Sequence, residues 1–201
     1  MKLAIPREQE DPRVAITPDA VPKLSDAGIE VLVEQGAGER ALFADADYEG
    51  ATIVSRQEAL SQADMILTIH PLPEAELNQL KADTVVASQF QPFNDEQVAG
   101  QLRSKQLRAL SLDMIPRTTL AQAMDVLSSM ASIAGYRAVL EAATHLPRYF
   151  PMMITAAGSI RPASVLVLGA GVAGLQAIAT ARRLGAQVEA FDTRSAAKEE
   201  V

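Results

Sequence analysis

The chain has 201 residues, 48% of them apolar, and its 25 acidic against 18 basic side chains give a net charge of −7. This length suffices for one large or two small domains, and the negative charge argues against a nucleic-acid phosphate backbone as a partner. The absence of cysteine excludes disulfides and thiolate chemistry. No apolar run approaches the ~20 residues that a membrane span needs, and we predict no metal site.

The N-terminal half of the chain alternates short apolar runs with helix-forming stretches. Strands are expected at residues 2–6, 29–34, 52–54, 65–70, 84–89 and 107–111, and helices at 18–27, 45–51, 57–63 and 95–105, with a loop and short helix at 71–80. The helix at 18–27 has Thr17 as its expected N-cap, Pro18 at its first position and Gly28 after its end. This alternation predicts an N-terminal domain with a parallel α/β sheet over residues 1–125.

A long helix is expected next, over residues 120–143, where Gly135 is the only internal helix breaker. Its apolar side chains can cover a buried seam: Met124, Leu127, Ile133, Ala134, Val139 and Leu140. Residues 126–201 are predicted to hold this interdomain helix and the start of a second α/β domain.

A strand, a glycine-rich turn and a helix follow in direct succession. The apolar run at residues 165–168 is typical of a strand buried on both faces. Gly169, Gly171 and Gly174 then have the spacing G-x-G-x-x-G and open an alanine-rich helix. A second strand over residues 188–191 leads to an acid about 20 residues after the first glycine, which together predict a dinucleotide-binding Rossmann fold.

Each glycine has a physical role in such a site. Gly169 permits the tight turn, Gly171 lets a pyrophosphate approach the backbone, and Gly174 lets the helix pack closely on the strand. The phosphates are then expected on free N–H groups at the positive end of the helix, those of Val172 and Ala173.

Asp192 stands at the end of the second strand and can accept hydrogen bonds from both ribose hydroxyls. Its charge would repel a 2′-phosphate, so we predict NAD(H) rather than NADP(H) as the bound cofactor. Arg194 leaves two interpretations open. It can serve a 2′-phosphate, or it can flank the adenine or face solvent.

The second sheet is predicted to be short. A doubly wound nucleotide domain has about six strands, whereas this chain stops at Val201, after the second one and a few helix-forming residues. We therefore expect an N-terminal fragment in which an apolar strand edge can favour self-association.

Three stretches carry a family resemblance that extends from Lys2 to Val201. The opening KLAIPREQEDPRVAITPDAV resembles the N-terminus shared by alanine dehydrogenases and the NAD(H)-binding alpha subunit of proton-translocating NAD(P) transhydrogenases. IPRTTLAQAMDVLSSMASIAGYRAVLEAA and ITAAGSIRPASVLVLGAGVAGLQA, followed by AFDTR, resemble the transhydrogenase version.

Alanine dehydrogenase is the alternative. That family places a lysine and a histidine at the positions of His70 and Gln91, and Gln91 cannot shuttle a proton at neutral pH. Arg13 matches an arginine that would hold a substrate carboxylate, or it forms an ion pair instead.

The transhydrogenase resemblance implies direct hydride transfer between two nicotinamides. Arg117 and Asp125 would then orient the carboxamide of NAD(H), and Gln122 would reach the NADP(H) held by a partner domain. Ser128 and Tyr136 match further residues near the nicotinamide. The structural alternatives are an ion pair between Arg117 and Asp125 at a helix start and a solvated Gln122.

The resemblance also implies partners. These are an NADP(H)-binding domain, a membrane proton-channel domain and a second copy of this chain in a homodimer, with the protein cytoplasmic and peripherally attached to the inner membrane. We interpret the chain as this NAD(H)-binding component, against a competing interpretation as a non-catalytic NAD-binding fragment.

Overall fold

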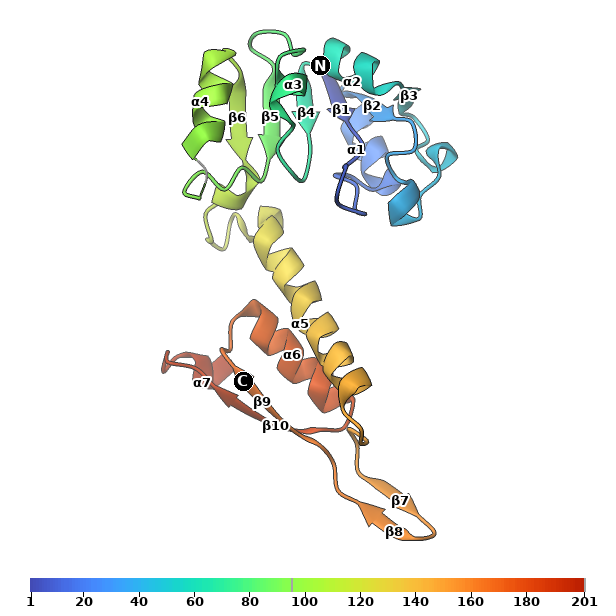
Figure 1. Cartoon of the computed structure of the whole chain (residues 1–201), viewed down its shortest axis with the longest axis vertical. Coiled ribbons are helices and arrows are strands. Elements are labelled where there is room, and N and C mark those ends of the chain that lie inside the picture. The colour runs from blue at the N-terminus through green and yellow to red at the C-terminus, as the bar shows by residue number, and fades with distance from the viewer. Residues whose placement is uncertain (95, 201) are drawn as a thin grey trace. The chain divides into compact units, whose positions relative to one another are not determined.

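The computed structural model describes residues 1–94 and 96–200, and the chain divides into two compact units (Figure 1). The first unit is Met1–Pro116 and the second begins at Arg117. The domain boundary between residues 125 and 126 stays a prediction.

The first unit is built on a six-stranded sheet in the order β3-β2-β1-β4-β5-β6 (Figure 1). Its strands are β1 (Lys2–Ile5), β2 (Glu30–Glu34), β3 (Thr52–Val54), β4 (Met65–Leu67), β5 (Val85–Ser88) and β6 (Arg108–Ser111). Every neighbouring pair runs parallel. This is the strand order of a doubly wound nucleotide-binding fold, and it confirms the predicted parallel α/β architecture.

Successive strand residues supply two cores, one on each face of this sheet, because side chains alternate along a strand. One core joins Ala4, Leu32, Ile66 and Val86 to side chains of α2 (Arg56–Gln62), α3 (Glu74–Leu77) and α4 (Glu96–Ser104). The other joins Leu3, Ile5, Val31 and Val33 to Val21 of α1 (Val21–Asp26) and to Tyr48. Short 3₁₀ turns complete the unit: η1 (Pro18–Ala20), η2 (Glu39–Ala41), η3 (Asp45–Asp47) and η4 (Leu112–Met114).

The helix expected at residues 18–27 is divided into η1 and α1, and Thr17 does not cap it. The Thr17 hydroxyl donates to Asp19 instead. Pro22 lies in the first turn of α1, where it has no N–H to offer. The expected N-cap was therefore wrong, although Gly28 follows the helix with φ +75° as predicted.

The second unit contains a parallel pair of strands, β9 (Ser164–Leu168) and β10 (Gln187–Phe191). Its helices are α5 (Val126–His145), α6 (Val172–Arg183) and α7 (Ala197–Glu200), after the 3₁₀ turn η5 (Gln122–Met124). The expectation of a second Rossmann-like sheet truncated after about two strands is confirmed. No described helix has the length and apolar character that crossing a bilayer requires.

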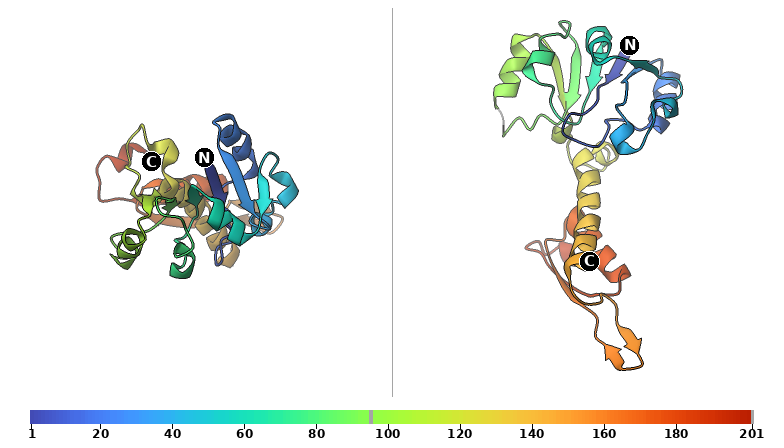
Figure 2. Two further views of the ribbon diagram at one scale, coloured as in Figure 1. Left: turned by 90° about the horizontal axis from the view of Figure 1, so that it is seen from above. Right: turned by 45° about the vertical axis from the view of Figure 1, so that its right-hand side comes forward.

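An antiparallel hairpin that the sequence did not predict precedes β9. It is formed by β7 (Met153–Thr155) and β8 (Gly158–Ile160), and Gly158 takes φ +123° at its turn. The hairpin projects away from β9 and β10 in both Figure 1 and Figure 2. Its three-residue strands are too short for the alternation that identifies a strand in a sequence.

The long helix α5 begins later than expected, at Val126 rather than residue 120, because Asp125 caps it. The Asp125 carboxylate accepts the backbone N–H of Ser128 at 3.0 Å. Its packed face also differs from the expected seam. Val139 and Gly135 are buried, whereas Met124 and Ile133 are 59% and 58% exposed.

Strand β9 was expected to be buried on both faces, but one face of the β9–β10 pair is open. Val165 and Val188 pack with Ala177 of α6 on the covered face. Leu166 and Leu168 are 61% and 75% exposed, and Phe191, paired with Leu168, is 60% exposed. Among the described residues α6 covers one face of this pair, so the other keeps an apolar surface.

Two glycines allow backbones to approach closely around the start of α6. A Cβ on Gly174 would lie 1.7 Å from the carbonyl oxygen of Gly169, and a Cβ on Gly135 would lie 2.1 Å from that of Ala173. Helices α5 and α6 lie side by side (Figure 1). Gly135 is therefore a packing position rather than a helix breaker.

Replacing Gly135 with alanine should destabilise the protein by about 1–3 kcal/mol, because overpacking outweighs the gain in helix propensity. Gly100→Ala in α4 is the matched control, since no atom lies within 4 Å of a Cβ added there. It should leave stability unchanged or raise it by up to ~1 kcal/mol. Urea unfolding of both variants measures the difference, and a Gly135→Ala midpoint equal to that of Gly100→Ala would contradict the close contact.

Candidate nucleotide-binding site

The glycine turn, residues 169–171, joins the carboxyl end of β9 to the start of α6. Gly169 has φ +98°, and a Cβ added to Gly169 or Gly171 would meet no atom within 4 Å. Gly171 is the N-cap of α6 and provides no side-chain cap. The first N–H groups of this helix, which include those of Val172 and Ala173, have no intrahelical partner. Open space and unpaired N–H groups at a helix start fit a pyrophosphate.

A hollow of about 580 Å³ lies beside the glycine turn, and we call it the α5 hollow. It is lined by one end of the turn, the first turns of α6 and the facing side of α5, with Arg117 at its edge. The lining residues are Arg117, Leu127, Ser128, Ala131, Ala134, Gly135, Ala138, Leu168, Gly169, Gly171, Val172, Ala173, Gly174 and Ala177.

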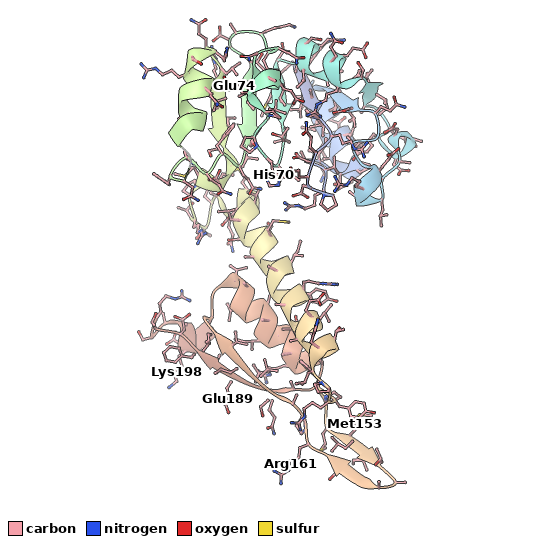
Figure 3. The ribbon with its side chains drawn as sticks, in the orientation of Figure 1. His70, Glu74, Met153, Arg161, Glu189 and Lys198 are labelled. Carbon is pink, nitrogen blue, oxygen red and sulfur yellow. The ribbon has the colours of Figure 1, made fainter. Side chains whose placement is uncertain are left out.

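A second hollow of about 480 Å³ lies at the end of β10, and we call it the Asp192 hollow. Its lining residues are Ala170, Ala190, Phe191, Asp192, Arg194, Ser195, Ala197 and Lys198, the last of which is labelled in Figure 3. Ala170 stands between Gly169 and Gly171, which line the α5 hollow. The two hollows therefore meet at the glycine turn, as a ligand with two ends and a central anion requires.

Asp192 is tied to the glycine turn by hydrogen bonds. One carboxylate oxygen, Oδ2, accepts the backbone N–H of Ala170 at 2.7 Å, and the other, Oδ1, accepts the backbone N–H of Arg194 at 2.8 Å. The Arg194 guanidinium donates to the same carboxylate. This guanidinium, together with the two N–H groups, holds the pKa of Asp192 well below its usual range, so the carboxylate is charged at neutral pH.

Asp125 is buried at the start of α5, where Ser128 engages both of its oxygens. The Ser128 N–H donates to Oδ1 at 3.0 Å and its hydroxyl donates to Oδ2 at 2.5 Å. These bonds, with a smaller contribution from the charge of Arg117, lower the pKa of Asp125. Asp125 therefore fixes the position of Ser128, which lines the α5 hollow.

The structure separates the remaining predicted site residues from the two hollows. Gln122 lies in η5 with an exposed side chain. Tyr136 lies on α5 and is 49% exposed. Neither lines the α5 hollow or the Asp192 hollow.

Several lining residues were missed by sequence reasoning. Leu127, Ala131, Ala134 and Ala138 recur at helical spacing and form the wall of α5 that faces the glycine turn. That run of small residues was the signal available. Ala170 contributes through its backbone alone, so no side-chain pattern could have identified it.

The first unit holds the residues considered for an alanine dehydrogenase site. Arg13 pairs with Asp11 at 2.5 Å, and His70, at the carboxyl edge of the sheet in Figure 3, contacts the same Asp11 oxygen at 3.0 Å. The Arg13 guanidinium holds the pKa of Asp11 well below its usual range. Gln91 is exposed in a loop with φ +47°. Within residues 1–94 and 96–200, no three acidic or histidine side chains form a group that could hold a metal ion.

Comparison with known proteins places both units of the chain in one family. The family model "Alanine dehydrogenase/PNT, N-terminal domain" matches residues 4–134, and its C-terminal counterpart matches residues 138–201. An NAD(P) transhydrogenase subunit alpha from Rhodospirillum rubrum is 46% identical over all of this chain and 55% of its own length.

Solved structures show the same similarity. A transhydrogenase from Sinorhizobium meliloti superposes with a TM-score of 0.96 at 42% identity, over the whole chain and 59% of that protein. An L-alanine dehydrogenase superposes with a TM-score of 0.85 at 29% identity, over the whole chain and 57% of that protein. The chain thus spans about half the length of the relatives it matches. It belongs to the alanine dehydrogenase/PNT family.

Proposed function

We propose that this chain binds NAD(H) across the glycine turn and acts as the NAD(H)-binding component of a proton-translocating transhydrogenase. The observation that carries the proposal is the Asp192 carboxylate, held by the N–H of Ala170 at the junction of two hollows. The identity to the alpha subunit of R. rubrum and the similarity to the S. meliloti transhydrogenase support the second half of it.

The Asp192 hollow is the proposed site of the adenosine half of the cofactor. The two oxygens of Asp192 would accept the ribose hydroxyls, and the pyrophosphate would lie on the N–H groups of Val172 and Ala173. Because Asp192 is charged at neutral pH, it disfavours a 2′-phosphate. The chain therefore selects NAD(H), and NADP(H) belongs to the partner domain.

The α5 hollow is the proposed site of the nicotinamide half. Arg117 and Ser128 line it, and Asp125 supports Ser128 from the helix cap. In this arrangement Arg117 and Asp125 orient the carboxamide, and Tyr136 contributes from the next turns of α5.

Bound NADH supplies a hydride that passes directly to NADP⁺ on the partner. No proton is moved at the reacting carbons, so the task of the chain is to position the ring and exclude water. The exposed side chain of Gln122 is available to contact the partner domain. The proposal includes a homodimer, cytoplasmic location and peripheral attachment to the membrane through the proton-channel domain.

An alanine dehydrogenase activity has less support. Gln91 offers no acid or base, and the guanidinium of Arg13 already pairs with Asp11. The chain should not oxidise NADH in the presence of pyruvate and ammonia. Such an oxidation, followed by absorbance at the NADH band, would reverse the order of the two proposals.

Asp192→Ala should weaken NADH binding by about 10- to 100-fold, because it removes charged acceptors for two hydroxyls. NADPH binding should change by less than about threefold, since that cofactor gains little from this carboxylate. Titration of each cofactor with nicotinamide fluorescence as the readout measures both constants.

The control for this substitution is Glu189→Ala, which removes one negative charge from the same strand, at the position labelled in Figure 3. It should leave both constants unchanged. Equal losses of NADH and NADPH affinity in Asp192→Ala would show that Asp192 does not contact the ribose.

Gln122→Asn should slow hydride transfer to an NADP⁺ analogue on the reconstituted complex by about 10- to 100-fold, because a shortened side chain misplaces the partner ring. NADH affinity of the isolated chain should stay within about twofold, since Gln122 lines neither hollow. The exposed Gln57 on α2 provides the control Gln57→Asn. A Gln122→Asn variant with normal transfer rates would exclude a role at the interface, and wild-type NADH binding with no transfer at all would favour a non-catalytic fragment.

A further inference from the structure

The acceptor sites of Asp192 are filled in the ligand-free chain. A carboxylate offers about four lone-pair sites. Oδ1 accepts the N–H of Arg194 at 2.8 Å and its Nε at 3.1 Å, and Oδ2 accepts the N–H of Ala170 at 2.7 Å and the Arg194 Nη2 at 3.2 Å. Two ribose hydroxyls can bind this carboxylate only if two of these donors leave.

The two pairs of donors differ in how readily they can leave. The N–H groups of Ala170 and Arg194 belong to the backbone, so they stay with the folded turn. The side chain of Arg194 is 56% exposed, whereas that of Asp192 is 12% exposed. The guanidinium can therefore move into water while the backbone donors keep the carboxylate in place.

The geometry of the guanidinium matches that of the ribose it would replace. Nε donates to one oxygen and Nη2 to the other, as the 2′- and 3′-hydroxyls of a ribose would. Nη2 also donates to the carbonyl of Ala170 at 3.3 Å, so the side chain reaches across the wall of the Asp192 hollow to the glycine turn.

We propose that Arg194 is an internal competitor for the ribose, whose guanidinium occupies two acceptor sites of Asp192 until the 2′- and 3′-hydroxyls displace it. This inference rests on the proposed binding of NAD(H). It assigns the arginine to the control of ribose affinity rather than to the recognition of a 2′-phosphate. The competitor holds Asp192 ready for the ligand and lowers the net gain from binding it.

The test compares Arg194→Ala with the unchanged chain, using adenosine and 2′,3′-dideoxyadenosine as probes. Both probes are uncharged, so the loss of a positive charge affects them little. Adenosine should bind about two- to fivefold more tightly to Arg194→Ala, since the exposed ion pair no longer competes. Dideoxyadenosine, which cannot replace the guanidinium, should bind equally to both proteins.

Arg183→Ala is the matched control, because Arg183 lies at the end of α6, outside the lining of both hollows. Arg194→Lys should behave between the two, since one ammonium cannot form the same two-pronged contact. A measurement on the unchanged chain is independent of any folding defect. The NMR signal of the Arg194 Nε–H should shift when NADH or adenosine binds and should stay in place with dideoxyadenosine.

Weaker adenosine binding by Arg194→Ala would overturn the competitor role and make Arg194 a direct contact. Equal tightening for both probes would overturn it too, because the effect would not depend on the hydroxyls. NADH binding that leaves the Nε–H signal unchanged would overturn the competitor role alone. No saturable binding of NADH to the unchanged chain would overturn the proposed function and this inference together.

Discussion

At the start of α6, backbone meets backbone with no room for a side chain between. Gly174 lies against the carbonyl of Gly169, and Gly135 of α5 lies against the carbonyl of Ala173. These two contacts bring a strand end, a helix start and the middle of a second helix to one place. The open turn and the wall of small α5 side chains both depend on that approach. A methyl group at either glycine would separate the elements that define the α5 hollow.

Each hollow is also associated with a carboxylate that the backbone holds in place. Asp125 accepts the N–H of Ser128, and Asp192 accepts the N–H of Ala170. A side chain completes each set, a hydroxyl in one case and a guanidinium in the other. Such acids lose little conformational freedom when a ligand binds, because their rotamers are already restricted. The two sites differ in exposure of the second partner, and that difference makes one of them displaceable.

The parallel sheets and the glycine fingerprint were predictable because they follow from local patterns. Apolar runs alternate with helices in residues 1–116, and three glycines at fixed spacing follow a strand. The start of α5 was not predictable from helix propensity, because the cap formed by Asp125 and Ser128 outweighs the helix-forming residues before it. The packed face of α5 depends on the backbone contact at Gly135, so Ile133 faces solvent despite its apolar side chain. The bonds of Arg194 depend on the folded proximity of Ala170 and Asp192.

The hairpin of β7 and β8 differs in kind from the rest of the second unit. Its strands have three residues each, its residues are exposed or half-exposed, and Ile154 is 78% exposed. Two strands without a third or a covering helix are marginal in water. Its amide hydrogens should therefore exchange with solvent through local opening, while those of β9 and β10 wait for larger unfolding events. The unit combines a slowly exchanging nucleotide-binding core with an arm that opens and closes independently of it.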